Sequence, residues 1–254
     1  MVLTTDGEVF VQYARSVVKQ VDAIENLFSR RALCKKRFSI SVPRASYIAE
    51  AFSRFTARLD PADSVEIYYK ETNAQRVIRN ILQEDYTLGI IRYAKPYDKY
   101  FRLLLEEKGL VGEPVTEFRY VLLTGRDSDL AAGGKIDSRR LEGHIEIAHA
   151  DPFVPTLPFS TVKKEELSED TDRRIYVFER ASQFELLSHN RQTYMWGSPV
   201  PQELLDRYGL VQLSCPENER IYQDVLIRRR EYVLSSLDKL FLAELQASEQ
   251  RTFH

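Results

Sequence analysis

The stretch from residue 38 to residue 91 decides the fold class. It contains three short segments with strand character: FSISV (38–42), VEIYY (65–69) and LGII (88–91). The first alternates polar and apolar residues and stops at Pro43. The third is continuously apolar, as expected of a strand buried on both faces. Apolar residues at helical spacing fill the intervals 45–59 and 73–82. This β-α-β-α-β order predicts an α/β protein with a parallel sheet and right-handed crossovers.

The alternation of strands and helices continues to the C-terminus. Further strands are expected at 115–123, 144–149, 175–178, 194–196, 210–213 and 222–229, and further helices at 97–108, 182–189, 201–208 and 235–246. Residues 151–171 contain three prolines and many charges, and they predict an exposed insertion. Two groups of such elements predict two α/β lobes, and a cleft between lobes is a favoured place for a ligand.

Composition excludes several classes of protein. The chain has 254 residues with 36 basic and 38 acidic side chains. Taken as a whole, it lacks the excess of positive charge that is typical of nucleic-acid-binding proteins. No run of 18 apolar residues predicts a membrane span, and the acidic N-terminus does not resemble a signal peptide. The two cysteines, Cys34 and Cys215, fit a reducing compartment. We therefore expect a cytoplasmic protein without a membrane partner.

Residues 3–28, LTTDGEVFVQYARSVVKQVDAIENLF, predict a long helix ahead of the first strand. Thr5 and Glu8 stand at capping-box spacing, so the helix is expected to begin near Asp6. Its apolar residues form a stripe that is wide for a surface helix, which favours packing against a partner chain. The residues predicted to form this dimerisation stripe are Phe10, Tyr13, Val17, Val21, Ile24 and Phe28.

The motif Leu-Thr-x-x-Gly-x-x-Phe-x-x-Tyr-Ala-Arg in this helix resembles the linker helix of LysR-type transcriptional regulators. The order of elements over 38–246 is similar to the effector-binding domain of the same family. The resemblance implies a two-lobed fold like that of type 2 periplasmic binding proteins, preceded by a long linker helix. It implies three parts: linker helix and junction at 1–36, lobe I at 37–114 plus a returning segment at 215–254, and lobe II at 115–214.

The resemblance also implies a function. A small-molecule effector would bind between the lobes and change the geometry of a dimer or tetramer. DNA would be contacted only through a helix-turn-helix domain, which this chain lacks. The sequence departs from the family in lobe II, where Ser188–Thr193 replaces the usual glycine-rich turn. The alternative is a stand-alone solute-binding protein or a small-molecule enzyme of the same two-lobed fold.

Polar residues at strand ends are the candidate ligand-binding residues. Arg44 follows the first strand and precedes a helix, and helix N-termini and strand carboxyl ends favour anions in open α/β sheets. Arg92 either joins Arg44 around a dianion or pairs with a carboxylate such as Asp98, and Asn73 is also explained as a helix cap. The full candidate set is Arg44, Ala45, Ser46, Thr72, Asn73, Arg92, Tyr93, His149 and Asp151.

No pattern predicts catalysis, a cofactor or a metal site. Neither G-x-x-x-x-G-K-S/T, G-x-G-x-x-G nor G-x-S-x-G occurs, and no nucleophile–base set can be assembled. His144 and His149 are separated by an odd number of residues on a strand, so they point to opposite faces and are not expected to share a metal. A redox pair of Cys34 and Cys215 is a lesser alternative, because isolated cysteines are usually inert.

Overall fold

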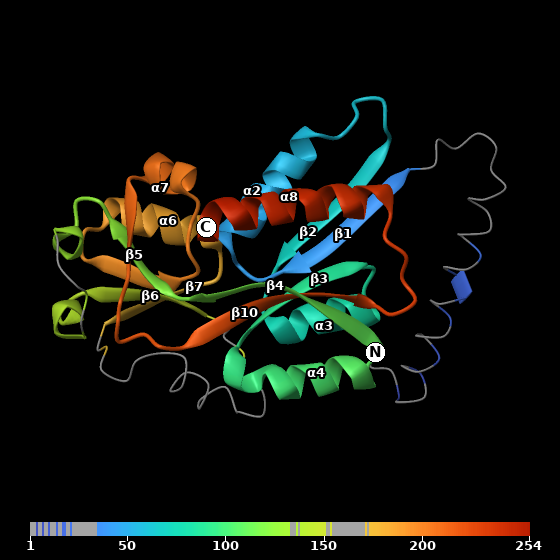
Figure 1. The fold of residues 1–254 in the computed structure, drawn as a ribbon, viewed down its shortest axis with the longest axis horizontal. Coiled ribbons are helices and arrows are strands. Elements are labelled where there is room, and N and C mark those ends of the chain that lie inside the picture. Colours follow the sequence, from blue (N-terminus) through green and yellow to red (C-terminus); the bar gives the residue numbers. More distant parts are fainter. Residues whose placement is uncertain are drawn as a thin grey trace.

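The computed structural model describes residues 35–132, 136, 138–150, 153, 171 and 173–254, together with Thr4, Gly7, Phe10, Ala14, Val17, Val18 and Val21. Tyr13, Ile24, Phe28, Cys34 and Asp151, all named above, lie outside the described residues. The described chain forms two α/β lobes, each built on its own sheet of five strands (Figure 1).

Lobe I contains the sheet predicted from residues 38–91. Its strand order is β2-β1-β3-β10-β4. The strands are β1 (Lys36–Val42), β2 (Val65–Glu71), β3 (Leu88–Ala94), β4 (Leu110–Arg119) and β10 (Ile221–Arg229). β1 is parallel to both β2 and β3, as predicted, whereas β10 lies antiparallel between β3 and β4.

Helices cover both faces of the lobe I sheet (Figure 1). One face packs on α2 (Ser46–Ala57) and α8 (Ser236–Phe253), and the other on α3 (Ala74–Gln83) and α4 (Asp98–Glu107), which follows a short 3-10 turn at Lys95–Tyr97. Neighbouring residues of one strand therefore enter different cores: Ile90 packs with α2 and α8, and Ile91 with α3 and α4. This explains why the LGII segment is continuously apolar. Gly89 is required in it, because a Cβ there would lie 2.6 Å from Val77 Cγ1 on α3.

Lobe II has the strand order β7-β6-β8-β5-β9. Its strands are β5 (Val121–Gly125), β6 (Ile145–His149), β7 (Arg174–Val177), β8 (Thr193–Gly197) and β9 (Leu210–Leu213). α6 (Arg180–His189) and α7 (Gln202–Tyr208) pack on one face, and the 3-10 turns Asp129–Ala131 and Ser138–Leu141 lie near a smaller core on the other. β6 runs parallel to β7 and β8, which places its carboxyl end near the start of α6.

The chain passes from lobe I to lobe II at Tyr120. The sequence predicts one continuous strand at 115–123 and a lobe boundary at residue 114, but β4 ends in the lobe I sheet at Arg119 and β5 begins in the lobe II sheet at Val121. The periodicity could not show this, because both segments are extended. The return crossing is held beside the first: Tyr120 stacks on Tyr222 with ring centroids 4.0 Å apart, and Asn218 Nδ2 donates to the Tyr120 carbonyl at 3.2 Å.

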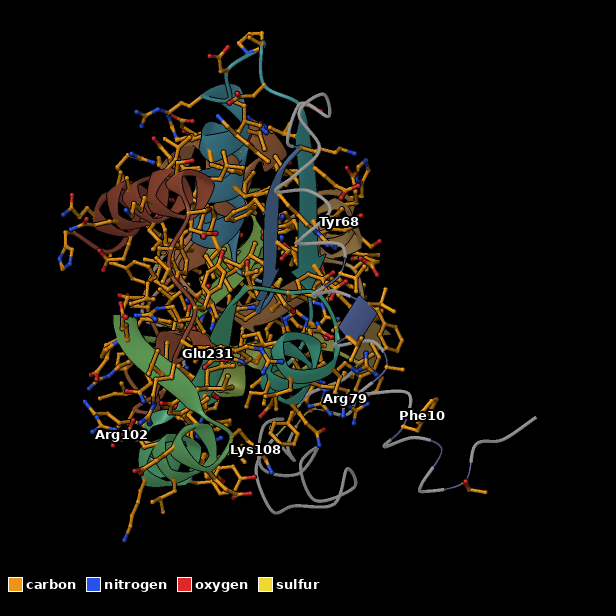
Figure 2. All side chains as sticks on the ribbon, turned by 90° about the vertical axis from the view of Figure 1, so that its right-hand side faces the viewer. Phe10, Tyr68, Arg79, Arg102, Lys108 and Glu231 are labelled. Atoms are coloured by element: carbon orange, nitrogen blue, oxygen red, sulfur yellow. The ribbon has the colours of Figure 1, made fainter. Side chains whose placement is uncertain are left out.

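Three residues of the predicted dimerisation stripe are described. Phe10, Val17 and Val21 are helical and 72%, 59% and 48% exposed. Figure 2 shows Phe10 away from the body of lobe I. In the described part of the chain, no helix is both long enough and apolar enough to cross a membrane.

Candidate functional site

A cleft between the lobes gathers polar side chains from both lobes. Arg44, Ser46 and Arg92 line it from lobe I, and His149, Arg180, Gln183 and Ser198 from lobe II. The cleft is nearly closed, with a free volume of about 20 Å³, which is about the room that one water molecule needs. A metabolite would therefore need the lobes to separate.

Arg44 reaches across the cleft from the end of β1. Its Nε donates to the Phe178 carbonyl oxygen of lobe II at 2.6 Å. Ala45 follows as the N-cap of α2 in extended conformation, with φ −140° and ψ 126°, and offers no capping side chain. The partly positive N-terminus of α2 and the guanidinium of Arg44 thus lie together at the cleft, an arrangement that favours an anion.

Arg92 is held by a carboxylate that the sequence did not reveal. Its Nε and Nη2 donate to Asp224 on β10 at 2.8 and 2.7 Å, and the Tyr47 hydroxyl donates to the same carboxylate at 2.6 Å. Burial would lower the pKa of Arg92, but the charge of Asp224 outweighs it and raises that pKa above its ordinary value. The predicted alternative, pairing of Arg92 with a carboxylate, is confirmed, but the partner is Asp224 and not Asp98, which accepts hydrogen bonds from Tyr93 and Gln223.

His149 is a neutral group in this site. Its Nδ1 lies 2.9 Å from Gln183 Nε2, and the amide N–H can donate only if Nδ1 is unprotonated. Burial lowers the pKa of His149 to about 3, and the nearby charges of Arg44 and Arg92 add to the effect. The imidazole therefore adds no positive charge to the cleft near neutral pH.

A second pair joins the lobes at the cleft. Arg180 Nε on α6 donates to Glu71 Oε1 at the end of β2 at 3.0 Å, and Tyr69 donates to the same oxygen at 3.2 Å. Further out, Arg54 on α2 and Glu203 on α7 approach to 3.3 Å. Arg180 and Gln183 were missed from the sequence, although their spacing of three residues places them on one face of α6.

Four predicted residues do not line the cleft. Ala45 is buried in the lobe I core, and Thr72 is tied to β1 by its backbone N–H, which donates to Val42 O at 2.8 Å. Asn73 accepts from the Arg76 N–H at 3.0 Å, which confirms the interpretation as a helix cap. Tyr93 points to the opposite face of β3, where it stacks on Phe101 at 4.1 Å.

The histidines predicted not to share a metal lie apart. His144 Nε2 pairs with Asp129 at 2.8 Å, whereas His149 bonds to Gln183. Among the described residues, no group of three or more His, Cys, Asp or Glu side chains could hold a metal ion. Cys215 is a half-buried thiol beside the Ile136 carbonyl oxygen, at 3.4 Å.

Known structures share this architecture. No protein-family model matches the sequence, and neither does any curated protein. The effector-binding domain of QuiR in complex with shikimate is 16% identical with a TM-score of 0.54, over 87% of this chain and all of that chain. The regulatory domain of MetR, a LysR family regulator from N. meningitidis, is 15% identical with a TM-score of 0.53, over 85% and 95% of the two chains.

A full-length OxyR from Pseudomonas aeruginosa also matches. It is 13% identical with a TM-score of 0.55, over 97% of this chain and 78% of that chain. The chain therefore has the two-lobed α/β fold of LysR-family effector-binding domains, and the fold class predicted from the sequence is confirmed. The structural neighbours are regulatory domains of transcription factors.

Proposed function

We propose that this chain is the linker and ligand-sensing portion of a LysR-type transcriptional regulator, and that it binds a small anionic metabolite between its lobes. The observation that carries the proposal is that Arg44 and the N-terminus of α2 meet a neutral His149 in one inter-lobe cleft, beside Arg92 and Arg180, which are held by Asp224 and Glu71. Arginine holds a permanent charge and a planar fork of donors, which suits a carboxylate.

The mechanism rests on two states of the lobes. Arg44 and Arg180 each bridge the lobes through a hydrogen bond or ion pair, so the arrangement described above is a closed one. An anion that satisfies these groups better than the protein does would bind one lobe angle more tightly than another. Such a difference in affinity is sufficient to shift the population of the two lobe arrangements, and the shift in lobe angle can change the position of an attached DNA-binding domain.

The comparisons support this reading over the alternative of an enzyme or a stand-alone binding protein. The QuiR domain is described in complex with shikimate, a carboxylate, and the match to full-length OxyR covers 97% of this chain. Within the described residues, His149 is bonded to an amide rather than to a nucleophile. We further propose a cytoplasmic protein that self-associates through Phe10, Val17 and Val21.

Calorimetry with carboxylates on the parent chain and on Arg44→Ala tests the proposal. Loss of a charge-assisted partner is expected to weaken binding by about ten- to a hundredfold. Arg79→Ala is the matched control, because Arg79 is an exposed arginine on α3, on the outside of lobe I in Figure 2. If a carboxylate bound the parent chain and Arg44→Ala with equal affinity, the proposal that it binds in this cleft would be wrong.

A further inference from the structure

Three neutral polar side chains line the cleft, and one of them has a buried atom without a hydrogen-bond partner. Ser46 is 5% exposed, Gln183 1% and Ser198 5%. Gln183 Oε1 is a buried atom with no hydrogen-bond partner among the described residues, and the two serines line the same cleft with no hydrogen bond from either hydroxyl to the described chain. Buried polar atoms are normally hydrogen-bonded, and each unmade bond costs stability. Their collection in one cleft, from both lobes, indicates that they serve an occupant.

The chemistry of Gln183 restricts that occupant. Its amide N–H already donates to His149, so its free Oε1 can only accept. A bare carboxylate has no hydrogen to donate and would leave this oxygen unpaired. The two serine hydroxyls can donate or accept and suit either kind of group. The occupant therefore needs a hydrogen-bond donor in addition to its anionic group.

Electrostatics decides between the two common donors, an ammonium and a hydroxyl. Arg44 faces the cleft beside the N-terminus of α2, while Arg92 and Arg180 are already paired with Asp224 and Glu71, and none of the described lining side chains is acidic. An ammonium would find no unpaired carboxylate among these lining side chains and would stand beside the guanidinium of Arg44, where like charges repel. A hydroxyl carries no such cost.

We propose that the ligand is a hydroxylated carboxylate whose hydroxyl groups bond to Ser46, Gln183 and Ser198 while its carboxylate faces Arg44. This inference rests on the proposed function and names the ligand class for the same site. The rival occupant of the three polar groups is a trapped water, for which the cleft has room.

The experiment compares matched carboxylates by calorimetry on the whole chain. Four sets are used: lactate, propionate and alanine; malate, succinate and aspartate; gluconate and hexanoate; quinate and cyclohexanecarboxylate. In at least one set, the hydroxylated member is expected to bind about tenfold or more tightly than the member without hydroxyls, because a site with unpaired polar groups rejects a ligand that cannot pair them. The amino member is expected to bind most weakly.

Variants assign the preference to residues. Ser46→Ala, Ser198→Ala and Gln183→Leu are each expected to reduce the preference for the hydroxylated member to about threefold or less. The two serine variants should leave the thermal midpoint of the empty chain unchanged or raised, because neither hydroxyl has a protein partner to lose. Ser39→Ala is the control: Ser39 is 1% exposed and its hydroxyl donates to Asp85 O at 2.8 Å. It should lower the midpoint and leave the preference intact.

Two outcomes would overturn the inference. If members with and without hydroxyls bind equally in every set while Arg44→Ala weakens both, anion sensing stands, and the three polar groups hold a trapped water. If no carboxylate binds at about 10 mM, beyond the weak end of specific binding, the ligand class and the proposed function fail together.

Discussion

Replacing Asp224 by alanine tests the buried network beneath the cleft. Asp224 is fully buried, and it accepts two hydrogen bonds from Arg92, whose side chain is only 10% exposed, and one from Tyr47. Removing one partner of a buried ion pair costs about 3–5 kcal/mol, because the other charge is left without compensation. The orphaned Tyr47 hydroxyl adds about 1 kcal/mol or more.

The expected loss is therefore about 4–6 kcal/mol, a large part of the stability of an ordinary domain. Urea unfolding followed by circular dichroism measures it, with Glu84→Ala as the control. Glu84 pairs with Lys70 at the surface, both about half exposed, so its loss should cost less than about 1 kcal/mol.

A double variant separates charge from packing. Asp224→Leu combined with Arg92→Met replaces the pair by apolar groups and should recover most of the lost stability, because such replacements are often neutral. A loss below about 1 kcal/mol for Asp224→Ala would refute the reasoning, since it would mean that Arg92 reaches water or another partner at no cost.

Three further predictions concern pH, lobe closure and self-association. The pKa of His149 is about 3 in the folded chain and about 6.5 when unfolded, so the unfolded chain binds the proton first as the pH falls. Stability should decrease by about 1–2 kcal/mol between pH 7.5 and pH 5 in urea titrations, and His149→Gln should remove this part of the dependence. Glu71→Gln should open the lobes and raise the radius of gyration measured by X-ray scattering. The swap Glu71→Arg with Arg180→Glu should return the radius of gyration to that of the parent chain. An unchanged radius in Glu71→Gln would show that the Glu71–Arg180 pair does not keep the lobes closed. Val17→Asp with Val21→Asp should convert a self-associated chain to monomer in sedimentation, and a parent chain that is strictly monomeric at tens of micromolar would contradict the proposed helix contact.

The sequence was sufficient to predict those strands and helices whose hydrophobic pattern is imposed by packing on a single sheet. The continuous apolar run at 88–91 and the helical spacing at 73–82 predicted β3 and α3, because packing on both sheet faces imposes those patterns. The location of strand ends also brought Arg44, Arg92 and His149 together correctly in one cleft. Arg44 and Arg92 follow from topology, since the parallel strands β1 and β3 end at a common edge of the lobe I sheet, whereas His149 ends β6 in the separate sheet of lobe II.

The errors arise where distant parts of the chain meet. Arg92 pairs with Asp224, 132 residues away, and no local pattern identifies such a partner, although a lone acid in the apolar segment 221–227 was a hint. Tyr93 could have been excluded, because neighbours on a strand point to opposite faces. Gln183 and Ser198 were missed because the sequence does not show which face of lobe II meets lobe I.

The position of β10 has a consequence for biosynthesis. β10 is the central partner of both β3 and β4, yet it follows the whole of lobe II in the chain (Figure 1). Lobe II is continuous over 121–213 and can form as a unit while the ribosome is still translating. Until residues 221–229 emerge, β3 and β4 each present an open edge, which is a template for aggregation. The nascent chain thus carries a finished lobe beside an unfinished one until the last strand of the lobe I sheet has been translated.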